Sequence, residues 1–185
     1  MSKSHILRSG SIFKKEDAAR LILGEDILFP DEVVEVRGLS YSEEQLKQLA
    51  AMLPSEEVFR SLGKSNYALM PAPPIPMSFL DVCEMKFDIS GKWYADENFA
   101  MNDKTIFGWL AICKDIVPKS MGKNWKEQCR LLGSEERVPN AAEFAWFITT
   151  YYEVRDVKLF GNILRELHLC PATTAFASAA GARTA

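Results

Sequence analysis

"SEERVPNAAEFAW", residues 134–146, is the stretch that decides the fold, because it places a helix start in front of an aromatic run. Pro139 fixes the approach of the backbone, and Asn140 is a favoured N-cap residue. Glu143, three residues later, completes a capping box, since its carboxylate can reach back to the backbone N–H of the cap. Its charge also suits the positive end of the helix dipole. The stretch therefore predicts a helix start, and capping accounts for Glu143 better than the alternative of a catalytic role.

The helix that follows is apolar on most of its sides, which predicts deep burial rather than a surface position. Its large side chains are Phe144, Trp146, Phe147, Ile148, Tyr151 and Tyr152. A second helix is predicted just before it, in "NWKEQCRLLG", residues 124–133. There Asn124 is the N-cap, Glu127 stands at the capping-box position and Gly133 ends the helix.

These two helices together resemble a segment of the formylglycine-generating enzyme and sulfatase-modifying-factor family. In that family a W-x-x-A-x-x-[FC]-C-x-W-L helix is followed by "RLPTEAEWEYA". Trp125 and Cys129 belong to the first helix here. The likeness covers residues 106–152. The second motif has the pattern arginine, aliphatic, proline, alanine, glutamate and two aromatics. In this chain the matching residues are Arg137, Val138, Pro139, Ala142, Glu143, Phe144 and Trp146, and Asn140 is the cap.

The resemblance implies an α+β fold with a C-type-lectin-like domain, a fold shared with the variable proteins of diversity-generating retroelements. A wider run of the chain is also similar to uncharacterised bacterial proteins that carry this domain behind a small helical segment. The family's chemistry needs a copper-binding cysteine pair after the second motif, where this chain has only Cys170. We therefore expect a divergent, C-terminally shortened member with an incomplete domain and no cofactor.

The proline-rich segment at residues 71–77 divides the chain in this interpretation, because four prolines in six residues favour extended backbone. We expect an N-terminal helical appendage at 1–70, a linker at 71–77, the partial domain at 78–168 and a disordered tail at 169–185. The appendage is predicted to hold helices at 14–24, 42–53 and 55–63 and a short extended segment around 33–36. Strands are predicted within 79–89 and within 105–117.

Composition excludes several classes of function. The chain of 185 residues is 48% hydrophobic with a formal net charge of −3, and it has no basic block long enough to follow a row of phosphates. We expect no nucleic-acid partner. The start of the sequence has no continuous apolar region of a secretory signal, and no apolar run approaches the roughly 20 residues that span a bilayer. A cytoplasmic protein without a membrane contact is expected, and its oligomeric state stays open.

Two classes of function remain. The first is a non-enzymatic binding module with a protein partner, to which Trp93, Tyr94 and Trp109 would contribute a surface; core packing is the alternative explanation of these aromatics. The second is an enzyme, either a divergent formylglycine-type oxidoreductase or a thiol enzyme that uses Cys129 or Cys170 with His168. No metal site is expected, since the spacing of the acidic residues is not an EF-hand ladder; these are Asp96, Glu97, Asp103 and Asp115.

Overall fold

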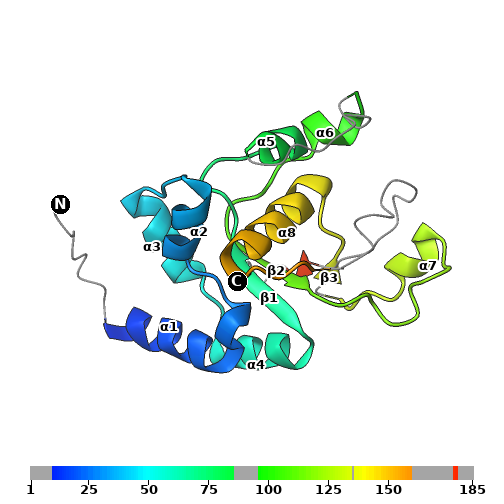
Figure 1. Ribbon diagram of the computed structural model, residues 1–185. Helices are drawn as coiled ribbons and strands as arrows, with labels where there is room; N and C mark the ends of the chain where they lie inside the picture. Colours follow the sequence, from blue (N-terminus) through cyan, green and yellow to red (C-terminus); the bar gives the residue numbers. More distant parts are fainter. Residues whose placement is uncertain (1–9, 86–95, 135, 160–176, 179–185) are drawn as a thin grey trace.

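The fold is mixed α+β and mostly helical, with helices on both faces of a small antiparallel sheet (Figure 1). The computed structural model describes residues 10–85, 96–134, 136–159 and 177–178, the first four and last two by their backbone alone. The elements are α1 (Gly10–Leu23), the 3-10 turn η1 (Gly24–Asp26), α2 (Pro30–Arg37), α3 (Glu43–Met52), α4 (Glu56–Lys64), β1 (Tyr67–Pro71), α5 (Phe79–Glu84), α6 (Asn98–Asn102), β2 (Trp109–Cys113), α7 (Trp125–Cys129), β3 (Glu136–Arg137), α8 (Ala141–Arg155) and β4 (Ala177–Ser178).

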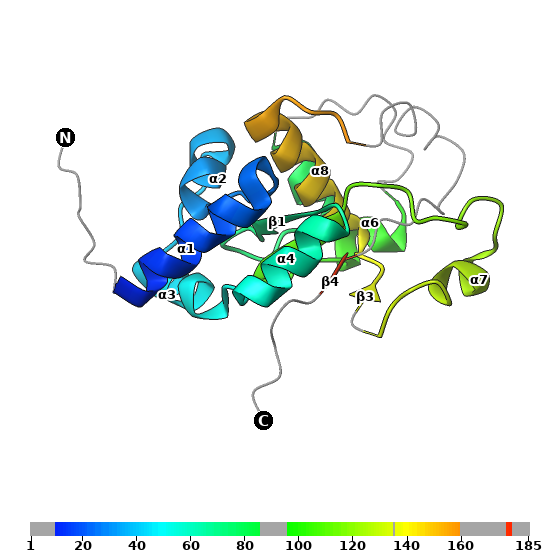
Figure 2. The ribbon, with the colours of Figure 1, turned by 90° about the horizontal axis from the view of Figure 1, so that it is seen from below.

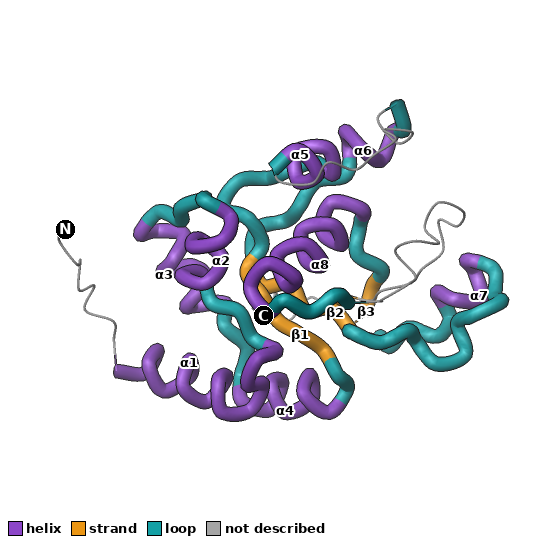
Figure 3. The backbone as a smooth tube through the Cα atoms, viewed as in Figure 1, coloured by secondary structure: helices purple, strands orange, loops and turns teal. Residues whose placement is uncertain are grey.

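The body of the sheet is the antiparallel pair β1–β2, in register from Tyr67 opposite Cys113 to Pro71 opposite Trp109 (Figure 3). The two-residue strands β4 and β3 extend it, and the order is β1-β2-β4-β3. Pro71, which has no N–H to donate, ends the edge strand β1, where the ladder tolerates a proline. The strand predicted within 105–117 is thus confirmed as β2.

Both strands are buried on both faces, which explains why their sequences are continuously apolar rather than alternating. Successive side chains of a strand point to opposite faces, and here the two faces belong to two different core clusters. Ala68, Met70, Leu110 and Ile112 pack into the first cluster. Their neighbours along the strands, Tyr67, Leu69, Trp109 and Ala111, pack into the second.

The first cluster is closed by α8, α2 and α5 and the second by α1, α3 and α4. Figure 2 shows α8 on one side of β1, with α1 and α4 on the other. The largest fully buried side chain is Trp146 of α8, which donates its indole N–H to the Pro71 carbonyl at 3.1 Å. That bond ties the long helix directly to the end of the sheet.

Most of the helices predicted from capping signals are confirmed, because a cap is decided by residues only three positions apart. Ser42 and Gln45 form the predicted capping box of α3. Asn124 and Glu127 do the same for α7, although this helix ends at Cys129 and not at Gly133 as predicted, and Asn140 begins α8 as expected. Helices α1 and α4 also lie where they were predicted.

The extended segment predicted around residues 33–36 is wrong, since these residues belong to α2. Its valines favour a strand, but the ends of the segment favour a helix. Pro30 occupies the first helical position, where its missing N–H costs nothing. The Glu32 carboxylate accepts the Phe29 N–H at 2.9 Å, and Gly38 takes the left-handed conformation with φ 65° that ends the helix.

The strand predicted within residues 79–89 is wrong over its described part, where Phe79–Glu84 form α5. Ser78 and Asp81 make a capping box, and the Asp81 carboxylate accepts both the backbone N–H and the hydroxyl of Ser78. These hydrogen bonds hold the pKa of Asp81 below its ordinary value of 3.8. The cap therefore outweighs the irregular apolar alternation that indicated a strand.

The proline-rich segment 71–77 is largely buried rather than a free spacer, with Pro73 and Pro74 inside the fold. Tyr41 donates its hydroxyl to the Ala72 carbonyl at 2.7 Å, and Gln45 donates to the Pro74 carbonyl at 2.5 Å. Both core clusters contain residues from each side of this segment. The domain limits drawn from sequence remain a prediction; the packing runs continuously across them.

No helix in the described part of the chain is long and apolar enough to cross a membrane. Of the tail predicted at 169–185, only residues 177 and 178 are described, and they form β4 against β2 and β3. The remainder of that prediction lies outside the described residues.

Candidate interaction surface

The stretch that begins α8 is held by a buried carboxylate. Glu143 is 2% exposed, and its two oxygens accept hydrogen bonds from the Arg137 guanidinium at 2.6 and 2.7 Å. It also accepts the Asn140 backbone N–H at 3.0 Å, while the Asn140 side chain accepts the Glu143 N–H. The Glu143 hydrogen bonds raise the pKa of Arg137. Both oxygens of Glu143 are thus engaged in fixing β3 to the start of α8.

The segment between β2 and β3 projects from the body of the fold as an arm, defined here as residues 114–134 and carrying α7 near its end (Figures 1 and 2). Its root is fixed to the body at both sides. Lys114 forms an ion pair with Asp26 at 2.6 Å, and Gly133 donates its N–H to Glu136 at 2.7 Å. Tyr67 of β1 donates its hydroxyl to the same Glu136 carboxylate at 2.5 Å. The arm therefore leaves the sheet from a defined position.

The interior of the arm is polar and small, not a hydrophobic core. Gln128 of α7 and Ser120 are its buried residues, and the Gln128 amide donates to the Ser120 carbonyl at 3.2 Å. Gly122 has a φ of 73°, which lets the backbone turn toward the N-cap of α7. With only polar side chains fully buried, the arm covers its own large apolar side chains at most in part.

Two of those apolar side chains consequently lie mostly in solvent, while the others are half-buried or only partly exposed. Trp125 is 54% exposed and Met121 is 79% exposed, while Ile116 lies partly exposed at the root of the arm. Trp125 is the first residue of a five-residue helix whose positions three and four residues later are Gln128 and Cys129, so the helix itself cannot cover the indole. Exposed single hydrophobic residues are ordinary on proteins, but a half-exposed tryptophan beside an exposed methionine on a projecting segment is the composition of interaction surfaces.

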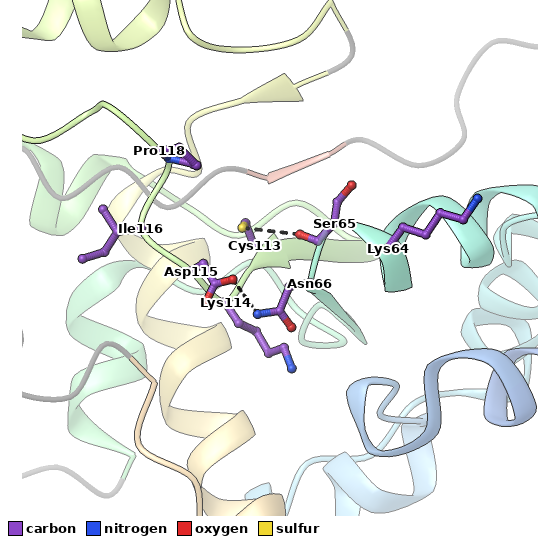
Figure 4. A pocket seen from close by; sticks show the side chains of 8 residues that line it. All are labelled: Lys64, Ser65, Asn66, Cys113, Lys114, Asp115, Ile116 and Pro118. Carbon is purple, nitrogen blue, oxygen red and sulfur yellow. Dashed lines mark hydrogen bonds between the residues drawn. The ribbon is translucent and has the colours of Figure 1, made fainter.

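An open hollow of about 770 Å³ lies where the arm leaves the sheet (Figure 4). It is formed by the end of α4, the turn into β1 and the first residues of the arm. Asn66, in the left-handed conformation with φ 55°, donates its amide to Asp115 at 2.7 Å and so joins two walls of the hollow. The lining residues are Lys64, Ser65, Asn66, Cys113, Lys114, Asp115, Ile116 and Pro118.

Burial disfavours the reactive thiolate form of two of the described cysteines, Cys113 and Cys83. The Cys113 thiol at the hollow faces the Ser65 carbonyl, 3.8 Å away, and burial raises its pKa. Burial also raises the pKa of Cys83, to about 11. A nucleophilic cysteine needs a lowered pKa or an adjacent base. Cys129, one of the predicted thiol candidates, lies half-buried on α7, and the predicted His168 and Cys170 lie outside the described residues.

The aromatic residues predicted to form a binding surface fall in different places. Trp93 and Tyr94 lie outside the described residues. Trp109 is 8% exposed and packs in the second core cluster, where its indole donates to the Leu49 carbonyl at 2.8 Å. This burial agrees with the core-packing alternative and removes Trp109 from the surface.

Sequence reasoning treated Trp125 as a marker of the fold and missed its exposure. The signal was present in the composition of the short helix "WKEQC", which has no apolar partner for the indole on its own face. Met121 is a second such signal of exposure, because it is followed by Gly122 and stands in a run otherwise rich in lysine.

No group of three or more acidic, cysteine or histidine side chains among the described residues is arranged to hold a metal ion. Comparison with known proteins identifies no relative: no family model, no curated protein and no solved structure matches the chain.

Proposed function

We propose that the protein is a non-enzymatic binding module that recognises a protein partner through the arm, residues 114–134. The observation that carries the proposal is the exposure of Trp125 on a projecting segment whose two ends are tied by the Lys114–Asp26 ion pair and the Gly133–Glu136 hydrogen bond. A fixed position of the arm lowers the ordering cost of association. An enzyme is less well supported, because burial raises the pKa of Cys83 and Cys113 and both oxygens of the buried carboxylate Glu143 are engaged in hydrogen bonds within the fold.

The physical case for a protein partner rests on the residue types of the arm. Tryptophan is enriched among the residues that contribute most to protein interfaces, because it buries a large rigid area at a small loss of side-chain entropy. Methionine adapts to the shape of a partner. Trp125 and Met121 lie four residues apart on one short segment, and the hollow at its root can accept a side chain of the partner.

The test is selection of peptides from a displayed random library on the folded full-length chain. We expect selected peptides to lose at least about tenfold in affinity when Trp125 is replaced by alanine, since losing a central tryptophan anchor costs 2 kcal/mol or more. Leu21→Ala is the matched control, because Leu21 of α1 is also an exposed large apolar residue and lies outside the arm. Peptides that bind Trp125→Ala as tightly as the parent chain would contradict the proposal.

We further propose that residues 78–168 are of C-type-lectin-like ancestry. The support is the start of α8, where Arg137, Pro139, Glu143 and Trp146 take the order of the family motif and Arg137 pairs with Glu143. An experimentally determined structure of the whole chain that superposes on no lectin-like domain would remove this proposal.

A cytoplasmic location is proposed on the state of the cysteines. Cys83, Cys113 and Cys129 are free thiols, and thiols stay reduced in the cytoplasm. Cell fractionation with a tagged chain tests the location, and recovery from an oxidising compartment would contradict it.

A further inference from the structure

The arm differs in charge from the rest of the molecule. Residues 114–134 contain five lysine or arginine residues and two carboxylates, so the segment carries a formal charge of +3. The whole chain carries −3, and the remainder therefore carries −6. A local surplus of one sign on a projecting segment attracts partners of the opposite sign.

The positive charges of the arm remain available to a partner. Lys114 is paired with Asp26 at the root. The other four cations form no ion pair with any described residue, and three of them are exposed while one is half-buried; they are Lys119, Lys123, Lys126 and Arg130.

The two carboxylates of the arm are already engaged within the fold. Asp115 accepts the Asn66 amide at 2.7 Å, and Glu127 accepts the Asn124 backbone N–H at 3.1 Å as part of the capping box of α7. The cations consequently face solvent without a neutralising neighbour on the arm, around the exposed Trp125 and Met121.

We propose, resting on the function above, that the partner segment is acidic: a protein segment in which aspartate or glutamate residues flank a large apolar side chain. The carboxylates would meet the four cations, and the apolar side chain would pack against Trp125 or enter the hollow. Lysine and arginine at the rim of an interface with an aromatic centre set partner choice and the rate of association.

A protein segment fits the arm better than a membrane surface does. Helices that bind in the plane of a bilayer are long and carry a continuous apolar face. Helix α7 has five residues and offers a single large apolar side chain, Trp125. The hollow at the root of the arm is lined by charged and polar side chains and also by Ile116 and Pro118, and this mixed lining suits a peptide better than lipid tails.

The experiment uses the peptides recovered by the library selection. We expect aspartate and glutamate to be enriched over lysine and arginine in them, and we expect replacement of their carboxylates by amides to weaken binding about tenfold. The double variant Lys119→Glu with Lys126→Glu should lose the same factor. Lys14→Glu with Lys47→Glu is the matched control, since both lysines are exposed, lie outside the arm and change the net charge equally.

The outcomes separate the two proposals. Peptides that depend on Trp125 but bind equally well as carboxylates and as amides overturn the acidic partner and leave the protein-binding function standing. A selection that yields no Trp125-dependent peptide contradicts both. Binding of the chain to vesicles of phosphatidylcholine with phosphatidylserine, or to a single-stranded oligonucleotide, with an affinity above that for the peptides, overturns the inference in favour of another anionic surface.

Discussion

Replacement of Glu143 by glutamine tests how the start of α8 is held. The glutamine side chain is nearly the same size and keeps an oxygen for the Asn140 N–H, so the helix cap survives. The change removes the charge that Arg137 contacts with two hydrogen bonds of 2.6 and 2.7 Å. It also turns the amide NH₂ of the glutamine toward the guanidinium. The guanidinium can only donate hydrogen bonds, so this NH₂ finds no acceptor among the atoms that Glu143 contacts.

The magnitude follows from the exposure of the two partners. A hydrogen bond to a charged group contributes about 1.5–3 kcal/mol, and Glu143 is 2% exposed. Arg137 is 41% exposed at its side chain, so water recovers part of its hydration when the pair is broken. We expect a loss of about 2 kcal/mol in the free energy of unfolding, which corresponds to a fall of about 4–8 °C in Tm for a chain of this length.

Urea unfolding followed by far-UV circular dichroism measures the loss, with equal m-values required for the comparison. Glu127→Gln is the matched control: Glu127 holds the same capping-box position in α7 but is exposed and has no arginine partner. It should cost about 0.5 kcal/mol or less. Equal losses in the two variants would refute the reasoning, because capping alone would then account for Glu143.

Three further outcomes are expected. Gly108→Ala should lose roughly 2 kcal/mol of stability in thermal melts, because its φ of 140° is a conformation that residues with a side chain rarely adopt. The methyl group would also lie 2.9 Å from Met52 Cε, but the flexible end of that side chain can move away. Gly122→Ala, at a φ of 73° with open space around it, should lose less. Burial raises the pKa of Cys83 to about 11 from 9.0. As the pH rises, the thiol therefore ionises in the unfolded chain before it ionises in the folded one, and the free energy of unfolding should fall between about pH 9 and pH 11. The fall should be less steep in Cys83→Ala, and an equally steep fall in the variant and the parent chain would contradict this. Trp125→Ala should leave stability within about 0.5 kcal/mol of the parent chain, and a larger loss would show that the indole is packed.

Local features of the fold were predictable from sequence, whereas features that depend on distant partners were not. The capping box of Asn140 and Glu143 is decided within three residues, and it is where the sequence placed it. The pairing of β1 with β2 runs from Tyr67 opposite Cys113 to Pro71 opposite Trp109, residues far apart in the sequence, and only β2 was recognised as a strand. Pro71 argued against a strand because its place at the sheet edge could not be seen in the sequence.

The two misassigned segments have one physical cause. Residues 30–37 and 79–84 are short and rich in apolar side chains, and a short apolar run fits a buried strand as well as a buried helix. The deciding hydrogen bonds belong to Glu32 and Asp81, which accept backbone N–H groups at the helix starts. Capping therefore carried more information in this chain than hydrophobic periodicity.

The candidate site was the least predictable part. Trp125 is exposed because the interior of the arm is polar and built around Gln128. Gln128 in turn is held by its hydrogen bond to the carbonyl of Ser120, in the turn before α7. Trp109 carries the same chemistry but is covered by helices from a distant part of the sequence. The sequence analysis offered Trp109 for a surface and used Trp125 only as a marker of the fold, and the packing reverses the two.

The most direct test of the binding function follows the indoles themselves during binding. In a chain labelled with fluorotryptophan, the fluorine resonance of Trp125 can be assigned with Trp125→Phe, and those of Trp109 and Trp146 with their own phenylalanine variants. On addition of a selected peptide, the account predicts that the Trp125 resonance shifts while those of the two buried indoles stay in place. A peptide that binds without moving the Trp125 resonance would contradict it.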